Sequence, residues 1–466
     1  MSEEVILQRT RALWVQLTGK TSLPFSLHVS GEGNLPSCYP VTPFISASVA
    51  LAGLALAQLL ALRHGKHDTV TVDRRLASLW SKSSIQPDGW DIPPAWDSLA
   101  GDYATADGWI RLHTNAPAHR QVVESLLGKA GTREALAQRV ILWKKADLEE
   151  AVIQAGGCAA QMLSVPEWQQ HVQGKSLQQE PLFQRALSPQ AALPQWDLSR
   201  ERPLAGVKIL DLTRIIAGPV ATRFLAGLGA EVLRIDPFGW DETSQEADVT
   251  LGKQCARLNL HNPQDRHRFE ALLREADVIV HGYRAGALHK LGYGSEQIRA
   301  LAPGLVDVCL NAYGWSGPWR ERRGFDSLVQ MSCGIAERGM QVSGGNRPVP
   351  LPVQALDHAT GYLMAAAVLH GLAQRVETGQ GSQTWLSLAR TALELMKSET
   401  SAELREPEIQ SATGADFSPE QEQTVWGPAW RLRPPVWLDN TTLQWNLPAS
   451  PLGSAPASWP EVRLAR

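Results

Sequence analysis

A single aspartate, Asp357, stands near the start of a long apolar segment that is predicted to be a helix. Its local surroundings allow two roles. As an N-cap, its side chain would accept hydrogen bonds from exposed backbone N–H groups, and local sequence alone favours this role. Alternatively, the backbone amides and partial positive charge of the helix N-terminus would keep a free carboxylate ionised. An ionised carboxylate without a partner is a nucleophile.

Other reactive residue types form no recognisable metal set. The histidines include no H-x-x-x-H pair, and His64 with His67 is typical of a turn. The cysteines are odd in number and scattered, without a C-x-x-C pair: Cys38, Cys158, Cys255, Cys309 and Cys333. This pattern disfavours a disulfide framework and a thiolate metal site. No metal site is predicted.

Composition excludes several classes of protein. The 466 residues include 44 Lys+Arg and 47 Asp+Glu, with 44% hydrophobic and 20% charged residues, as in an ordinary globular protein. A net charge of -3 gives no reason to expect nucleic acid or an anionic membrane as partner. The acidic N-terminus lacks the order of a signal peptide, so a cytoplasmic location is expected.

One uncharged stretch, residues 44–62, is long enough to span a bilayer. It is rich in alanine and contains Ser46, Ser48, Gly53 and Gln58. This composition favours a buried helix over a membrane span.

The second half of the chain alternates predicted strands with predicted helices. Strands are expected at 207–212, 230–236, 277–280 and 305–310, and helices at 217–228, 264–275 and 295–301. This alternation predicts an α/β domain with a doubly wound, parallel sheet. Ligands of such sheets bind beyond the carboxyl ends of the strands. The loops that begin at Thr213, Asp236, His281 and Asn311 are therefore expected to form the site.

A nicotinamide cofactor is disfavoured for this sheet. The loop from Thr213 to Pro219 contains no G-x-G-x-x-G sequence. Asp236, which closes the second strand, resembles a ribose-binding acid by position only.

An internal repeat is also indicated. The apolar helix ending at Arg63 and the one ending at Arg375 look alike at an offset of 312 (375 − 63), and each precedes a short strand and another helix. This alignment places Asp357 opposite Ile45, which predicts one working site and one retired site. The alternative is two unrelated Ala/Leu helices. Residues 186–203, rich in proline, are predicted to be a linker.

Ordered motifs across the second half carry a family resemblance. They are Pro203–Leu212, Ala217-Gly218-Pro219, Leu228–Val232, Gly252-Lys253, Leu258-Asn259-Leu260, Ala276–Val280, Gly286-Ala287-Leu288, Lys290-Leu291-Gly292, Asn311–Pro318, Gly361-Tyr362 and Gly379-Gln380-Gly381. The series resembles the class III CoA-transferases, which include formyl-CoA transferase, carnitine CoA-transferase and the α-methylacyl-CoA racemases.

The resemblance implies a domain plan. It predicts a Rossmann-like CoA-transferase domain with the aspartate at 204–400 and a closing segment at 401–466. Asp107–Leu112 and Ala155–Ala159 resemble the family's smaller α+β domain, so 1–185 is predicted to be a partial copy that includes it. The whole would be a rearranged partial duplication. Because family members are interlocked homodimers, either a homodimer or an intramolecular pseudo-dimer is expected.

The resemblance also implies site residues and substrates. Asp357 matches the family's nucleophile, which forms an acyl anhydride and then an aspartyl-CoA thioester. The residues expected to hold coenzyme A are Ile215, Ala217, Lys253, Tyr283, Arg284, Gly286, Lys290 and Arg323. Coenzyme A, as acyl-CoA, would be a substrate alongside a carboxylic acid, and no permanently bound cofactor is expected.

Departures from the family pattern leave two alternatives open. Gly282 and Ala285 replace the family's usual Asn and Pro, and Phe238 replaces an adenine-packing Arg of the formyl-transferase branch. These changes allow an inactive member that serves as a structural or regulatory partner. A racemase is disfavoured because Phe325 stands where that branch has its His, and Phe cannot transfer a proton. His358 is a candidate substitute, although a helix-surface position is favoured for it.

Overall fold

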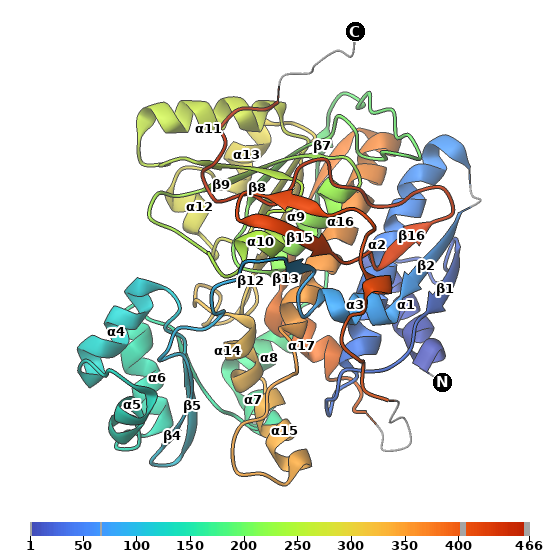
Figure 1. Cartoon of the computed structure of the whole chain (residues 1–466). Helices are drawn as coiled ribbons and strands as arrows, with labels where there is room; N and C mark the ends of the chain where they lie inside the picture. The colour runs from blue at the N-terminus through green and yellow to red at the C-terminus, as the bar shows by residue number, and fades with distance from the viewer. Residues whose placement is uncertain (1, 66–67, 401–406, 461–466) are drawn as a thin grey trace.

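The computed structural model describes residues 2–65, 68–400 and 407–460. Figure 1 shows a large body of helices and sheet, with a smaller lobe at its lower left. The small lobe comes from the first half of the chain, whereas the large body takes segments from both halves. The sequence halves are therefore not two separate globules.

A seven-stranded sheet forms the centre of the large body, in the order β10-β9-β8-β11-β12-β13-β7. Its strands are β7 (Gln184–Gln190), β8 (Lys208–Leu212), β9 (Glu231–Asp236), β10 (Lys253–Arg257), β11 (Val278–His281), β12 (Val306–Asn311) and β13 (Gln380–Ser387). All neighbours are parallel except β13 and β7. The four strands predicted from apolar runs are confirmed, as expected for strands buried on both faces.

Helices cover both faces of this sheet. Successive residues of β11 pack into different hydrophobic cores. Val278 and Val280 pack with α9 (Ala217–Gly227) and α16 (Ala355–Thr378). Ile279 packs instead with α11 (Pro263–Glu275) and α13 (Ser295–Leu301). Side chains of successive strand residues point to opposite faces, so both faces of the sheet are apolar. The predicted mixed α/β fold with a parallel-rich sheet is confirmed.

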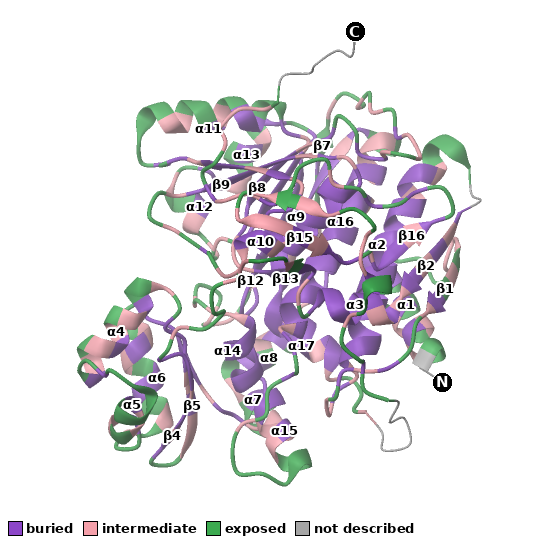
Figure 2. Cartoon of the chain, viewed as in Figure 1, coloured by how far each residue is buried: buried purple, intermediate pink, exposed green. Residues whose placement is uncertain are grey.

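Two long helices, α2 (Val41–His64) and α16, pack side by side in the interior (Figure 2). In the described residues, α2 is the helix long and apolar enough to cross a membrane. In its most apolar 18-residue stretch, however, 83% of the residues are buried inside the protein. The expected buried helix at 44–62 lies inside α2. Its neutral, small side chains let it pack closely against α16.

The two long helices begin with the same backbone conformation and have the same length. The N-cap residues Pro40 (φ −76, ψ 70) and Gln354 (φ −74, ψ 66) have nearly the same backbone conformation. At the other end, Gly65 and Gly379 each donate the backbone N–H to the carbonyl four residues back and have φ angles of 76 and 74, but their ψ angles, 179 and −1, differ. Both pairs are 314 positions apart (354 − 40 and 379 − 65).

The same spacing continues beyond the helices. The short helices α3 (Arg74–Trp80) and α17 (Leu388–Leu395) are capped by Asp73 and Ser387, again 314 apart (387 − 73). This spacing of 314 differs by two residues from the offset of 312 predicted from sequence, which aligned the similar Leu-Ala-x-Arg ends instead of the caps. Asp357 lies opposite Pro43, not Ile45.

Each long helix also joins a matching group of three strands. In a separate sheet, β1 (Ser26–Ser30) is parallel to β2 (Thr69–Asp73), and β16 (Val436–Leu438) is antiparallel to β2. In the large sheet, β12 is parallel to β13 and β7 is antiparallel to β13. The antiparallel strand of each group comes from the other half of the chain: β16 follows α16, and β7 precedes β8. The two groups exchange their third strands.

The predicted linker at 186–203 is wrong for its first part. Residues 184–190 form β7, the edge strand of the large sheet. Pro189 falls at a break in the register between β13 and β7, where a missing N–H is tolerated. An edge strand that pairs on one side needs little apolar periodicity, which explains why the sequence did not indicate it.

The small lobe packs three helices on an antiparallel sheet, β4-β5-β6. Its elements are β4 (Gly101–Thr105), β5 (Gly108–Leu112), β6 (Ala159–Gln161), α4 (Pro117–Leu127), α5 (Arg133–Val140) and α6 (Lys145–Gln154). The predicted α+β character of this region is confirmed.

The remaining elements connect the parts of the fold. They are α1 (Ser2–Thr18), β3 (Ile85–Pro87), α7 (Val165–Gln170), α8 (Val172–Gln178), α10 (Glu246–Val249), α12 (Ala287–Lys290), α14 (Asp326–Ser332), α15 (Ile335–Ser343), a 3-10 turn (Gly414–Asp416), β14 (Glu422–Thr424) and β15 (Gly427–Arg431). Strands β14, β15 and β3 form a third small sheet, so the C-terminal segment closes over the first half.

Candidate active site

A cavity of about 520 Å³ opens beyond the carboxyl ends of the parallel strands, where the small lobe faces the sheet. Its walls include Thr213–Ile215 after β8, Trp240 after β9, Gly282–Arg284 after β11, and Asn311 at the end of β12. The order of the sheet reverses at β8, which lies between β9 and β11. This is the switch point at which such sheets bind ligands. The loops expected to form the site therefore do line one cavity.

Asp357 lies in the wall of this cavity. It is the third residue of α16 and is 8% exposed. The N-cap of α16 is Gln354, so the N-cap role for Asp357 is wrong. Within the described residues, no cation lies within 4.0 Å of its carboxylate and no hydrogen bond reaches its side-chain oxygens. The carboxylate is unpaired and faces the cavity.

Asp357 has a second carboxylate beside it. Asp326, at the start of α14, is fully buried and accepts hydrogen bonds from the backbone N–H of Asp357 at 2.9 Å and from Gln330 Nε2 at 2.5 Å. Burial raises the pKa of Asp326 to about 6. Burial, together with the charge of Asp326, raises the pKa of Asp357 well above its usual range. Desolvation and a like charge therefore act against the helix N-terminus, which was expected to favour the ionised form of Asp357.

The loop after β8 is held in a strained conformation. Ile215 has a φ of 67, which is rare for a β-branched residue and costs on the order of 1–3 kcal/mol. Its N–H donates to Glu242 Oε1 at 2.8 Å, and this bond helps hold the loop. A Cβ at Gly361 would lie 2.5 Å from the carbonyl oxygen of Ala217, so α16 crosses the start of α9 in close contact. The predicted residues Ile215 and Ala217 both line the cavity.

Arginines dominate the charge of the cavity wall. Arg214, Arg284 and Arg323 have no carboxylate within 4.0 Å among the described residues, whereas Arg322 pairs with Glu149 at 2.6 Å. Arg323 Nη1 donates to the carbonyl oxygen of Gly156 in the small lobe at 2.6 Å. Asp357 is the one acidic residue of this wall in the described part of the chain, so the cavity favours a polyanionic ligand.

The aromatic residues of the wall hold one of these arginines in place. The Arg214 guanidinium lies 4.7 Å from the ring centre of Trp240 and 5.7 Å from that of Tyr283. Tyr283 and Arg284, both predicted site residues, therefore lie in the same wall.

Three predicted coenzyme A-binding residues lie elsewhere. Lys253 is fully buried, and its Nζ contacts Asp211 Oδ2 and the carbonyl oxygen of Pro219, each at 3.0 Å. Its charge is already compensated inside the core, so it does not reach the cavity. Gly286 only starts the short helix α12, and the side chain of Lys290 is 75% exposed, 3.6 Å from Glu321. Neither lies in the cavity wall.

The structure also changes the expectations for three nearby residues. His358 is buried rather than on the helix surface, and burial lowers its pKa to about 4. Asp236 pairs with Arg234 at 2.9 Å in the core, so it does not act as a ribose ligand. Phe238 is 66% exposed and lies outside the cavity wall.

The small lobe contributes a residue that sequence reasoning missed. His119, from α4, lines the cavity, and burial lowers its pKa to about 4, so it is neutral at pH 7. Phe325, which the motif had indicated, lies in the same wall and stacks on His113 with ring centres 3.9 Å apart. Nothing in the spacing of His119 links it to Asp357, because only the docking of the lobe brings them to one cavity.

These features define an α/β protein with a ligand cavity at the switch point of its sheet, arginine-rich and with one unpaired carboxylate. Residues 204–422 match the model of CoA-transferase family III. An acyl-CoA transferase of Gibberella moniliformis is 30% identical over 416 residues, which cover 78% of this chain and 72% of that protein. The chain belongs to CoA-transferase family III.

Other relatives match over shorter stretches. A succinyl-CoA:glutarate CoA-transferase of Homo sapiens is 34% identical over 203 residues, 40% of this chain and 45% of the relative. The crystal structure of Rv3272 from M. tuberculosis is 30% identical, covers 42% of this chain and 58% of that one, and superposes with a TM-score of 0.39. The chain thus spans about half the length of these two relatives.

Proposed function

We propose that this protein transfers coenzyme A from an acyl-CoA to a carboxylic acid, with Asp357 as the nucleophile. The observation that carries the proposal is the position of Asp357: an unpaired carboxylate in the wall of a 520 Å³ cavity that also presents three arginines without carboxylate partners among the described residues. Family membership and the names of the relatives support the same general activity.

The reaction proceeds by exchange at acyl carbons. A carboxylate oxygen of Asp357 attacks the thioester carbonyl, the C–S bond breaks, and CoA leaves as thiolate. The thiolate then attacks the side-chain carbonyl of Asp357 in the mixed anhydride, which releases the donor acid and leaves an aspartyl-CoA thioester. The acceptor carboxylate reverses these two steps and departs as its CoA thioester. Covalent catalysis replaces one difficult exchange with easier steps.

The cavity supplies the positioning that these steps need. Arg214, Arg284 and Arg323 would hold the phosphates of CoA through charge-assisted hydrogen bonds. His119 and Phe325, which also line the cavity, would bound the space left for the acyl and acceptor groups. Asp326 would not touch the substrate, because its side chain is bonded behind Asp357. Its charge sets how readily Asp357 loses a proton.

Mass spectrometry with a chemical trap tests the proposal. Succinyl-CoA is the first donor to try, because several relatives carry succinyl-CoA in their names. The protein is mixed with the donor, quenched with hydroxylamine and digested. A hydroxamate on Asp357 is expected, since both acyl intermediates activate that carboxyl group. If a panel of acyl-CoA donors leaves Asp357 unmodified, the alternative of an inactive family member is favoured.

We infer further that the chain is an intramolecular pseudo-dimer produced by partial duplication. The matching N-caps of α2 and α16 and the exchange of β7 and β16 support this. Such an arrangement predicts a molar mass near the 50.9 kDa of one chain in light scattering, whereas a homodimer would have twice that mass. The unpaired thiols of all five cysteines support a cytoplasmic location, which fractionation would test.

A further inference from the structure

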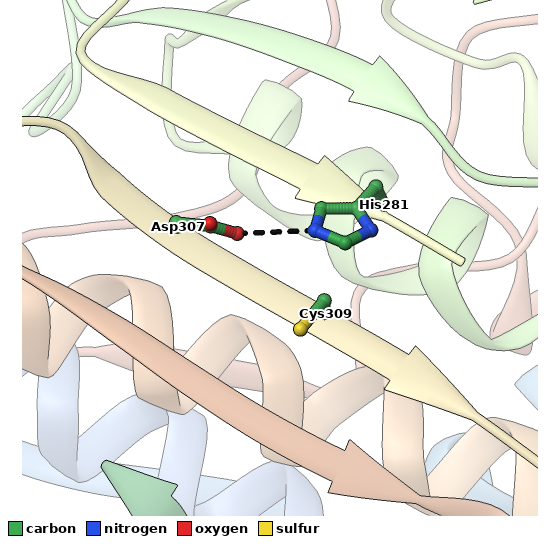
Figure 3. Close-up of side chains that lie close together, drawn as sticks. All are labelled: His281, Asp307 and Cys309. Carbon is green, nitrogen blue, oxygen red and sulfur yellow. Dashed lines mark ion pairs between the residues drawn. The ribbon is translucent and has the colours of Figure 1, made fainter. Parts of the chain in front are cut away.

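Three side chains with metal-binding atoms meet on one face of the large sheet (Figure 3). His281 ends β11, and Asp307 and Cys309 lie on β12. His281 is the register partner of Cys309, and Asp307 precedes Cys309 by two residues, so all three point to the same face. They are 7%, 5% and 0% exposed, and their ligand atoms lie within 4.8 Å of one another.

The polar atoms of this cluster do not satisfy one another. His281 Nε2 lies 3.3 Å from Asp307 Oδ1, but among the described residues Asp307 Oδ1 and His281 Nδ1 have no hydrogen-bond partner. Asp307 Oδ2, in contrast, accepts from Gln383 Nε2 at 2.7 Å. A buried polar atom without a partner costs about 1–3 kcal/mol, and a bound ion is one of the accepted explanations for it.

The separation of His281 Nε2 and Asp307 Oδ1 fits two ligands of one ion. Zinc binds imidazole nitrogen and carboxylate oxygen at about 2.0–2.2 Å, so tetrahedral geometry places two such ligands about 3.3–3.5 Å apart. His281 Nε2 and Asp307 Oδ1 lie 3.3 Å apart. Cys309 supplies the third donor, and a turn of its side chain away from the carbonyl oxygen of Thr384, 3.6 Å away, would bring the sulfur into range.

We propose that His281, Asp307 and Cys309 bind one zinc ion. Thiolate and imidazole ligands select zinc over magnesium or calcium, which prefer oxygen. The ion would join the ends of β11 and β12 directly before Gly282–Arg284 and Ala312, which line the cavity. The three protein donors would leave the fourth position of a tetrahedral ion to water, and the bound ion would hold the two loops that line the cavity. Sequence spacing did not indicate this site, because only strand pairing brings position 281 beside position 309.

Metal analysis of the full chain tests this proposal. The protein is expressed with zinc in the medium, purified without an affinity tag, and analysed by inductively coupled plasma mass spectrometry. About one zinc ion per chain is expected. Cys309→Ser and Asp307→Asn, which change size little, are expected to lower zinc to background. Cys333→Ser removes an equally buried thiol far from the cluster and should retain the full amount.

Cobalt gives a second readout that does not depend on the stability of the variants. Wild-type protein exchanged with Co²⁺ should show a thiolate-to-cobalt charge-transfer band, which Cys333→Ser keeps and Cys309→Ser loses. After removal of metal by a chelator, added Zn²⁺ should raise the unfolding temperature of the wild type and of Cys333→Ser but not that of Cys309→Ser. Zinc-free wild-type protein that does not respond to added Zn²⁺, or equal zinc in wild type and Cys309→Ser, would overturn the proposal.

Discussion

The units built on α2 and α16 have the same framework but differ at their first turns. Each contains a long helix, a strand with one parallel and one antiparallel neighbour, and a short capped helix. Each long helix also begins at a cavity, of about 420 Å³ for α2 and about 520 Å³ for α16. At the equivalent position, however, one wall presents Pro43 and the other Asp357.

The difference shows that the framework alone does not make a site. The α2 unit has no counterpart of β8, β9 and β11 among the described residues, and the loops after β8 and β11 supply Arg214 and Arg284 to the α16 cavity. In the α16 unit, the burial of Asp357 beside Asp326 without a cation lowers the stability of the fold. A buried carboxylate that lowers stability is present at the cavity with these loops and absent from the other cavity. This pattern is typical of a functional site.

The largest expected effect is the loss of turnover in Asp357→Asn. Removing the nucleophile should lower kcat by at least about a thousandfold, since an amide cannot form the anhydride. Steady-state transfer between succinyl-CoA and a panel of carboxylic acids measures it. Pro43→Asp is the matched test of the other unit: no hydroxamate is expected on residue 43. A hydroxamate on residue 43 would show that the α2 unit can also form the acyl intermediate.

Asp357→Asn, although inactive, should be more stable than the wild type at high pH. The folded state raises the pKa of Asp357, so this group contributes full stability below its unfolded pKa of about 4 and loses it as the pH rises. Asp357→Asn is therefore expected to be more stable than the wild type at pH 8, with the difference vanishing toward pH 4. Urea unfolding at several pH values measures this. A variant less stable at pH 8 would contradict the burial cost assigned to Asp357.

A smaller effect is expected from the arginines. Arg284→Ala and Arg323→Ala should each raise the KM for acyl-CoA about tenfold or more, because one charge-assisted contact contributes about 1.5–3 kcal/mol. Arg9→Gln is the matched control, since Arg9 lines the cavity of the α2 unit and also lacks a carboxylate within 4.0 Å among the described residues. Its KM should stay unchanged. An equal rise in all three variants would contradict the assignment of coenzyme A to the α16 cavity.

The pH dependence of acylation should shift in Asp326→Asn. In the wild type, the rate of hydroxamate formation is expected to rise with pH as Asp357 loses its proton. Removing the charge of Asp326 lowers the pKa of Asp357, so the rising limb should move to lower pH. Rapid-quench experiments from pH 5 to 9 (roughly the range over which a raised carboxyl pKa titrates) measure the limb. An unmoved limb would show that Asp326 has only a structural role.

The smallest effect is expected where the two helices meet. Gln58 Oε1 of α2 lies 3.0 Å from His370 Nδ1 of α16. Gln58→Leu and His370→Leu should each cost about 1 kcal/mol of stability, and the double variant less than their sum, because the two groups form one bond. Urea unfolding of all four proteins measures the coupling, with kcat as the control that should not change. Additive losses would show that the contact contributes nothing.

The sequence indicated which loops line the cavity, but not every strand of the large sheet. Apolar runs located β8, β9, β11 and β12, and strand ends are where ligands of parallel sheets bind, so Thr213, Arg284 and Asn311 were found. Lys253 was predicted to hold coenzyme A because of its positive charge. In the structure that charge pairs with Asp211, which is buried on another strand. The edge strand β7 was missed because it pairs on one side only, and pairing partners far along the chain leave no local pattern.

Local patterning by itself determined the central strands β8, β9, β11 and β12 and placed Asp357 in the first turn of α16, because these depend on neighbours within a few residues. The tertiary structure decided the rest. The proton affinity of Asp357 depends on burial and on Asp326, the cavity depends on where the lobe with His119 docks, and the offset of 314 depends on matching caps. Each of these is set by long-range contacts, and desolvation and charge proximity act through space rather than along the chain.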